Sequence, residues 1–208
     1  MQHQTLLLPL FYLPPIEFFS LLLNSKEILI EQHEHYVKQT YRNRCHILGA
    51  NGTVPLSIPV QHGKKEHTKF KEMKISYADN WQKLHWKSIE SAYRSSPYFE
   101  YYEDQFKGFY HNQYEFLFDF NLELIKVVLQ ILDIQKELKF TKSYEEDYSN
   151  NYVDQRDSLH PKKESDHKII PYTQVFSSKF DFIPNLSIID LLYNEGPNAI
   201  NFLKHTED

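Results

Sequence analysis

The sequence has little glycine, a single cysteine and no excess of basic residues. Five glycines among 208 residues form neither a GxGxxG nor a GxxxxGK[ST] pattern, so no glycine-rich phosphate loop is predicted. Cys45 stands alone, which excludes an intramolecular disulfide and favours a reducing, cytoplasmic location. The formal net charge of −5 lacks the basic face that nucleic-acid binding needs, so we expect no nucleic-acid partner.

Long hydrophobic runs are also missing. Residues 6–10 and 18–23 are apolar, but a Pro-Pro pair and a glutamate separate them, and neither run approaches the roughly 20 residues of a membrane span. No lysine or arginine precedes Lys26, so the basic start of a secretory signal is absent. The sequence therefore predicts neither a membrane span nor export.

Aromatic residues and histidine are abundant, with 15 Tyr, 15 Phe and 11 His. Such a mixture can line a sugar or base pocket, but it can equally fill the core of a chain from an AT-rich genome. Composition alone favours the core.

Short apolar runs alternate with helical patterns. Strands predicted at 5–11 and 27–33, joined by a helix that Pro14-Pro15 opens, make a right-handed βαβ unit. Further strands are predicted at 53–60, 72–77, 138–141 and 171–176, and helices at 40–48, 81–92, 113–132 and from Ser187, which matches a capping-box start.

Together these elements predict an α/β fold. We expect a single domain over residues 1–208, with a mixed, mostly parallel sheet flanked by helices and a more helical C-terminal half. Residues 142–168 are polar and without period, which predicts a long flexible loop or lid.

The densest polar group lies in residues 31–46. If the chain stays extended to residue 35, Glu31, His33 and His35 share one face at the carboxyl end of a strand, where open α/β sheets bind ligands. Imidazole and carboxylate suit zinc or iron, but the spacing is neither HExxH nor that of a zinc finger, and we predict no metal. General acid–base chemistry with His33 or His35 as the base is the other option, and a solvated surface loop is the alternative to both.

Cationic and amide side chains follow in the same segment. Arg44 could bind a carboxylate or phosphate with its guanidinium fork, Lys38 could add a point charge, and Asn43 could donate to an oxyanion. A Cys45–His46 dyad is rejected, because adjacent residues on the predicted helix diverge by about 100°.

Residues from later in the chain could complete a site. His85 lies on the apolar stripe of its predicted helix, either as a pocket base or as a core histidine bonded to a backbone carbonyl. Tyr172 and Gln174 face the same way from the predicted strand, so they could bind a polar ligand or satisfy the sheet edge. Asp190, in the first turn of its helix, is explained as a cap that complements the helix dipole.

An ordered series of motifs runs along nearly the whole chain. It reads LPPIEFFSLL (13–22), IEQHEHYVKQTYRNRCHILGANG (30–52), LSIPV (56–60), WQKLHW (81–86), SPYFEYYED (96–104), HPKK (160–163), PYTQVF (171–176) and PNLSIIDLLYNEGPNAI (184–200). This series resembles the WbqC-like family, and more narrowly its short members in Bacteroidetes-type bacteria. The RNR and LSIIDLL segments are its most specific parts.

The resemblance implies a role in surface-polysaccharide (O-antigen) biosynthesis, as a transferase of an acyl, aminoacyl or glycosyl-type group onto a sugar. Three departures put the substrate in question. Leu8-Pro9 replaces a Gln-Pro, Gln32 stands where longer members carry Asp, and 142–168 replaces a Gly- and Ser-containing stretch. The family's motif positions are kept at Pro9, Phe11, His33, Tyr36, Lys38, Asn43, Arg44, Trp81, His85, Tyr93, Tyr172, Gln174, Phe176, Ser187 and Asp190.

The first functional hypothesis is therefore a transferase that uses an activated sugar or acyl donor and no cofactor. His33 or His35 would be the base, Arg44 with Lys38 would bind an anionic group, and segment 142–168 would close over the pocket. His85, Tyr172 and Gln174 would complete that pocket. A non-catalytic sugar- or nucleotide-binding or scaffold protein of the same pathway is the alternative, a structural metal protein is a third, and a homo-oligomer is left open.

Overall fold

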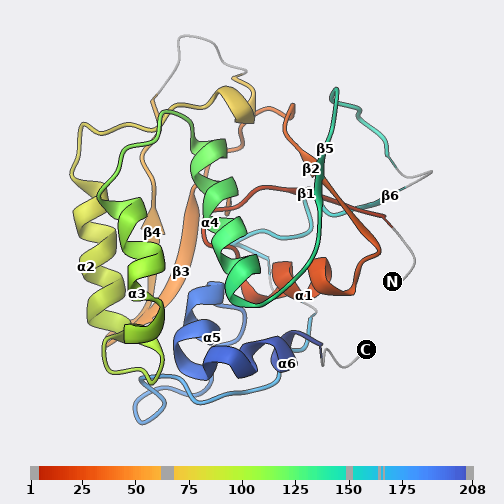
Figure 1. The fold of residues 1–208 in the computed structure, drawn as a ribbon. Coiled ribbons are helices and arrows are strands. Elements are labelled where there is room, and N and C mark those ends of the chain that lie inside the picture. The colour runs from red at the N-terminus through yellow and green to blue at the C-terminus, as the bar shows by residue number, and fades with distance from the viewer. Residues whose placement is uncertain (1–4, 62–67, 149–151, 164, 166, 205–208) are drawn as a thin grey trace.

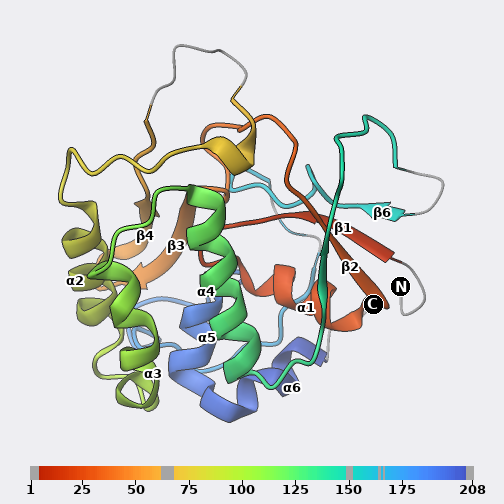
Figure 2. The ribbon, with the colours of Figure 1, turned by 45° about the horizontal axis from the view of Figure 1, so that its top comes forward.

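The computed structural model describes residues 5–61, 68–148, 152–163, 165 and 167–204. A parallel sheet forms one side of the molecule, and a hairpin with helices α2 and α3 beside it forms the other (Figures 1 and 2). Helices α4 and α5 lie between these two parts. The chain is thus a mixed α/β domain with a helical C-terminal region, as predicted.

The predicted βαβ unit begins the fold. Strand β1 (Thr5–Pro9) pairs in parallel with β2 (Glu27–Glu31), and helix α1 (Ile16–Asn24) connects them, with Pro15 in the N-cap position. The side chains of Leu6, Leu7 and Leu8 are all buried, so both faces of β1 are covered. A continuous apolar run is what a strand buried on both faces of a parallel sheet requires.

The parallel sheet has the strand order β5-β2-β1-β6. Strand β5 (Leu138–Phe140) pairs with β2, while β6 (Tyr152–Asp154) pairs with the opposite edge of β1. In chain order, β2 and β5 lie on one side of β1, and β6 then lies on the other side. That reversal makes the carboxyl ends of β1 and β6 a topological switch point, where open parallel sheets bind ligands.

The helix predicted at residues 40–48 is wrong. Residues Arg44–Gly49 form strand β3, which pairs antiparallel with β4 (Gly52–Ser57). Buried Cys45 and Ile47 alternate with half-buried residues, which is the period of a strand. Gly52 follows the two-residue turn with a φ of 109°, and an Asn-Gly pair such as Asn51-Gly52 is typical of a hairpin.

Two other predicted strands are also wrong. Residues 72–77 make only the isolated bridges Val60↔Ile75 and Lys74↔Phe116, and residues 171–176 form no strand. The predicted loop 142–168, in contrast, contains β6. This three-residue strand pairs with β1, which is distant in sequence, so no local sequence pattern predicts it.

The helices follow the apolar periodicity more closely. Ser187 precedes α5, but its hydroxyl donates to the carbonyl of Leu13 (2.9 Å) and makes no capping bond, so the predicted capping box is wrong. The observed helices after β4 are α2 (Trp81–Tyr93), α3 (Phe99–Lys107), which was not predicted, α4 (Leu117–Ile131), α5 (Ile188–Glu195) and α6 (Ala199–Lys204), with 3₁₀ turns at Phe70–Glu72, Gly108–Tyr110 and Gly196–Asn198. Among the described residues, no helix is long and apolar enough to cross a membrane.

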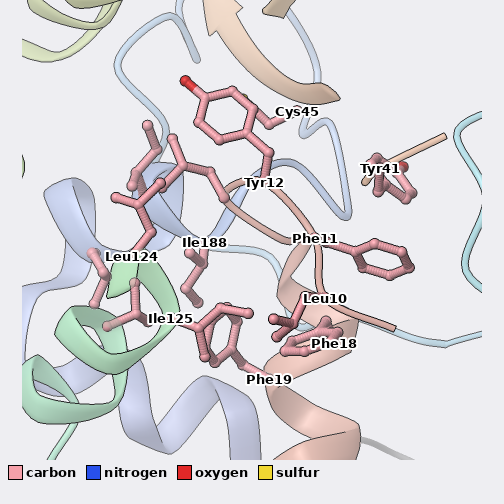
Figure 3. Close-up of a cluster of buried hydrophobic side chains, with 14 of the residues drawn as sticks. Leu10, Phe11, Tyr12, Phe18, Phe19, Tyr41, Cys45, Leu124, Ile125 and Ile188 are labelled. Atoms are coloured by element: carbon pink, nitrogen blue, oxygen red, sulfur yellow. The ribbon is translucent and has the colours of Figure 1, made fainter. Parts of the chain in front are cut away.

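The aromatic residues fill the core. Phe11 and Tyr12 from the β1–α1 connection belong to one buried cluster with Phe18 and Phe19 of α1, Leu124 and Ile125 of α4, and Ile188 of α5 (Figure 3). The four aromatic side chains are fully buried. The composition therefore reflects packing, and the connection that follows β1 is held between helices that come much later in the chain.

Candidate ligand pocket at the sheet edge

A cavity of about 350 Å³ lies at the topological switch point. Glu17 enters its lining from the first turn of α1, just beyond β1, and Gln155 enters directly after β6. This cavity, which we call the switch-point pocket, is within the size range of small-molecule sites. Among the described residues, the lining consists of Glu17, Tyr41, Gln155, Ser158, Leu159, His160, Lys163, Ser165 and Asn185.

An unusual backbone conformation occurs in the lining of this pocket. Four non-glycine residues in the described ranges have positive φ: Asn185 (55°) lines the pocket, and Leu13 (39°) and Gln39 (60°) are bonded to Ser187 and Lys162, which lie close in sequence to lining residues. The Ser187 hydroxyl holds the carbonyl of Leu13, and Lys162 Nζ donates to Gln39 Oε1 at 3.3 Å. Such conformations cost of order 1–3 kcal/mol each and cluster at functional sites.

The acidic wall of the pocket is built around Glu17. Its backbone N–H donates to Asn185 Oδ1 (3.0 Å), and Asn185 Nδ2 donates back to Glu17 Oε2 (2.9 Å). The hydroxyl of Ser165 donates to the same carboxylate oxygen at 2.6 Å. Burial and the negative charge of Glu17 raise the pKa of the Tyr41 hydroxyl to about 12. The carboxylate is therefore oriented by neutral donors that leave its charge in place.

The cationic wall comes from the HPKK segment. Lys163 is exposed and its Nζ donates to the Asp157 carbonyl at 2.8 Å. Burial lowers the pKa of His160, and the charges of Lys162, Lys163 and Arg42 lower it further. His160 Nδ1 accepts the backbone N–H of Lys162 at 3.1 Å, so the neutral ring keeps its proton on Nε2.

A buried ion pair stabilises the chain that follows β2 at this edge of the sheet. Arg42 donates to Glu34 through Nε (2.7 Å) and Nη2 (2.6 Å), with side chains only 2% and 8% exposed. Burial raises the pKa of Glu34, although Arg42 pulls it down. Arg42, the first residue of the RNR segment, therefore has a structural role that the sequence analysis did not assign.

A second buried carboxylate ends β2. Glu31 accepts the backbone N–H of His33 (2.6 Å) and hydroxyl protons from Thr141 (3.1 Å) and Tyr148 (3.3 Å). Arg156, next to β6, pairs with Asp154 at 2.5 Å. It also donates to the carbonyls of Glu145 and Glu146 at 2.9 and 3.0 Å. These bonds tie part of the predicted loop to the sheet edge.

The structure places the predicted catalytic histidines in different surroundings. Strand β2 ends at Glu31, so the expected common face of Glu31, His33 and His35 is not formed: Glu31 is fully buried and His35 is exposed. His33 is half-buried, and its Nε2 has no hydrogen-bond partner among the described residues. Lys38 is exposed in the turn that follows.

His85 lies in the core. Its Nδ1 is hydrogen-bonded to the Tyr12 hydroxyl (3.0 Å), which also bonds Tyr110 (2.8 Å). Burial lowers the pKa of His85 to about 4, while a hydrogen bond with the backbone of Ser57 opposes the shift. These contacts match the core-histidine alternative.

Asn43 and Arg44 stabilise the hairpin. Asn43 Nδ2 donates to the carbonyl of Ile58 at 2.8 Å, and Arg44 Nε donates to Ser57 Oγ across β3 and β4 at 3.0 Å. Both side chains thus have partners in the same part of the fold.

Tyr172 and Gln174 do meet, on Asp190. The carboxylate of Asp190 accepts bonds from Tyr172 (2.6 Å), Gln174 (3.1 Å) and Tyr93 (2.8 Å), and it is fully buried. Burial raises the pKa of Asp190, while these three donors oppose the shift. The Asp190 cluster, formed by these four residues, is therefore a closed interior network and not part of the switch-point pocket.

Within the described ranges, no group of three or more His, Cys, Asp or Glu side chains is arranged to hold a metal ion. The residues that sequence reasoning missed are Glu17, His160, Lys163 and Asn185. All four lie in the LPPIE, HPKK and PNLS motifs, so the motif series marked them, but no local pattern indicated that these motifs converge.

The fold is that of an α/β protein with a cavity at the carboxyl edge of a parallel sheet. The model of the WbqC-like protein family matches residues 11–157, and the chain belongs to this family. The match includes Glu17, Tyr41 and Gln155 and ends before His160.

One relative from the curated proteins extends the likeness to most of the chain. The uncharacterized protein Rv1507c of Mycobacterium tuberculosis (strain ATCC 25618 / H37Rv) is 26% identical over 219 residues, covering 93% of this chain and 94% of the relative. No solved structure matches.

Proposed function

We propose that the protein is a transferase of surface-polysaccharide biosynthesis that moves an acyl, aminoacyl or glycosyl-type group from an activated donor onto a sugar. The switch-point pocket would bind the donor. One observation carries this proposal: a cavity of about 350 Å³ at the switch point combines Glu17 with His160, Lys163 and several amides and hydroxyls. Family membership supports the pathway.

The chemistry of the lining supports a phosphate-bearing, hydroxylated ligand. Lys163 would pair with the phosphate, and the Nε2–H of His160 would donate to it. The side chains of Gln155 and Ser158 would bond sugar hydroxyls, and buried Tyr41 would supply an apolar wall. We also propose that His33 or His35 acts as a base and that Lys38 binds an anionic group, at the neighbouring edge of the sheet beyond β2.

The contacts of the other predicted site residues favour structural roles. Asn43 and Arg44 hold the hairpin, His85 bonds Tyr12, and Tyr172 and Gln174 bond Asp190. We therefore propose that their substitution lowers stability more than ligand affinity.

The test is a product search with defined probes. Purified protein is mixed with UDP-N-acetylglucosamine, GDP-mannose or acetyl-CoA and a set of free sugars, and products are followed by mass spectrometry. We expect one donor to be consumed in stoichiometric amounts with a modified sugar. Lys163→Ala and His160→Ala should lose at least tenfold in donor affinity, whereas Lys204→Ala, a matched exposed lysine on α6, should not. Full affinity in both pocket variants would rule out this site.

A non-catalytic sugar- or nucleotide-binding protein of the same pathway is the second proposal. One observation favours it: Asn185 and Ser165 already satisfy Glu17, which is the arrangement of a preformed binding site. Micromolar binding of a probe without turnover in the presence of every acceptor would select this proposal over the transferase.

A further inference from the structure

The carboxylate of Glu17 is held in one orientation at the pocket wall. Asn185 bonds it reciprocally, accepting its backbone N–H at 3.0 Å and donating to Oε2 at 2.9 Å. Asn185 does so from a left-handed backbone conformation, with a φ of 55°. Fixing a side chain from a strained position is how a fold preorganises a reacting group.

A hydroxyl group is already hydrogen-bonded to one carboxylate oxygen of Glu17. Ser165 Oγ donates to Glu17 Oε2 over 2.6 Å, the length of a strong O–H···O⁻ bond. Ser165 is itself half-buried and lines the same pocket. An alcohol bonded to a carboxylate in this way has the geometry that general-base catalysis requires of an attacking hydroxyl.

We propose that Glu17 is the general base that receives a hydroxyl of the acceptor sugar in the place now taken by Ser165. The inference rests on the transferase proposed above and assigns a catalytic residue to it. It also commits the acceptor to a group that can donate a proton to a carboxylate.

The reaction balances without a further reagent. The acceptor oxygen attacks the electrophilic carbon of the donor and forms the new C–O bond. The bond from that carbon to the leaving group breaks, and the leaving group departs with the electron pair. Glu17 takes the acceptor proton and later releases it to water. The Lys163 charge in the same lining stabilises an anionic leaving group.

The decisive variant is Glu17→Gln, which keeps the size and polarity of the side chain and removes the base. With the donor found in the product search, we expect a transfer rate lowered by about 100-fold or more and a donor Kd within twofold of wild type. Glu17→Asp, which keeps a carboxylate, should keep part of the rate that Glu17→Gln loses. Glu100→Gln, another first-turn glutamate, on α3, is the matched control.

Three outcomes separate the possibilities. Transfer by Glu17→Gln within threefold of wild type, with donor bound, overturns the role of Glu17 and leaves the transferase standing. Wild-type protein that transfers nothing overturns the transferase and, with it, this inference.

Ser165→Ala provides the third outcome. If Ser165 holds the acceptor's place and helps to orient Glu17, its removal should lower the rate but leave measurable transfer. Loss of all transfer in Ser165→Ala, together with a donor-derived mass on Ser165 of the wild type, would make serine the nucleophile and overturn the proposal.

Discussion

Asp190 and Glu17 are both carboxylates in the first turn of a helix, yet their surroundings differ. Asp190 is fully buried and surrounded by Tyr93, Tyr172 and Gln174, which all donate to it. Glu17 is half-buried and lines a cavity. Either position suits a carboxylate that complements the helix dipole, the role that the sequence predicted for Asp190. The two carboxylates therefore differ in solvent access, and not in residue class or helix position.

The largest effect on stability should come from opening the Asp190 cluster. Asp190→Ala leaves the hydroxyls of Tyr93 and Tyr172 without this acceptor, while Gln174 Nε2 keeps its bond to the carbonyl of Ile183 at 2.9 Å. We expect the free energy of unfolding to fall by about 4 kcal/mol. Urea unfolding followed by circular dichroism measures this change. Asp190→Asn, which keeps one acceptor oxygen, should lose less. A loss below about 1 kcal/mol in Asp190→Ala would contradict a structural role.

The second prediction concerns His85, a buried titratable group that should affect the pH dependence of the free energy of unfolding. Because its pKa is lowered to about 4 in the folded protein, the unfolded chain binds a proton first, so stability is present above about pH 6.5 and is lost as the pH falls toward 4. The loss should approach 3 kcal/mol in wild type and be absent from His85→Gln. Unfolding measured from pH 7 to 4 checks it, and equal slopes in the two proteins would refute it.

Asn185 lies between the two extremes, because it is both strained and part of the pocket. Asn185→Ala loses the bonds to Glu17 and places a side chain at positive φ, so we expect about 2 kcal/mol of destabilisation. Asn185→Gly keeps the backbone conformation available and should lose only about 1 kcal/mol. Thermal unfolding compares them. A glycine variant less stable than the alanine variant would show that the backbone is not strained.

Lys163 should have the smallest effect on stability and a large one on binding. Lys163→Ala removes an exposed charge, and unfolding should change by less than about 0.5 kcal/mol. Its affinity for UDP, measured by calorimetry in low salt, should fall about tenfold, because a cation–phosphate contact is lost. An unchanged affinity for UDP would show that the phosphate does not bind next to Lys163.

Local patterns in the sequence predicted much of the fold. Apolar runs predicted β1, β2 and β5, and apolar periodicity predicted α2 and α4. The errors at 40–48 and 171–176 arose where the structure of a short segment depends on its partner. Segment β3 is a strand because it pairs with β4. Tyr172 and Gln174 are held by hydrogen bonds to Asp190 and not by pairing with another strand.

The pocket was harder to predict than the fold. The sequence predicted a site at the carboxyl end of β2, whereas β6 places the topological switch point on the other side of β1. Glu17, Lys163 and Asn185 come from distant parts of the chain, so only the strand order brings them together. A sequence pattern records periodicity, and strand order leaves no periodic signal.

The bond from Ser187 to Leu13 also has a consequence for biosynthesis. The two residues are 174 positions apart, so the connection that follows β1 has left the ribosome long before its clamp is synthesised. Long-range contacts of this kind form late in folding. Strands β1, β2, β5 and β6 are all synthesised before residues 185–187, whereas the orientation of the Glu17 carboxylate depends on its bonds with Asn185. A nascent chain that already holds all four strands of the sheet therefore still lacks one wall of the pocket.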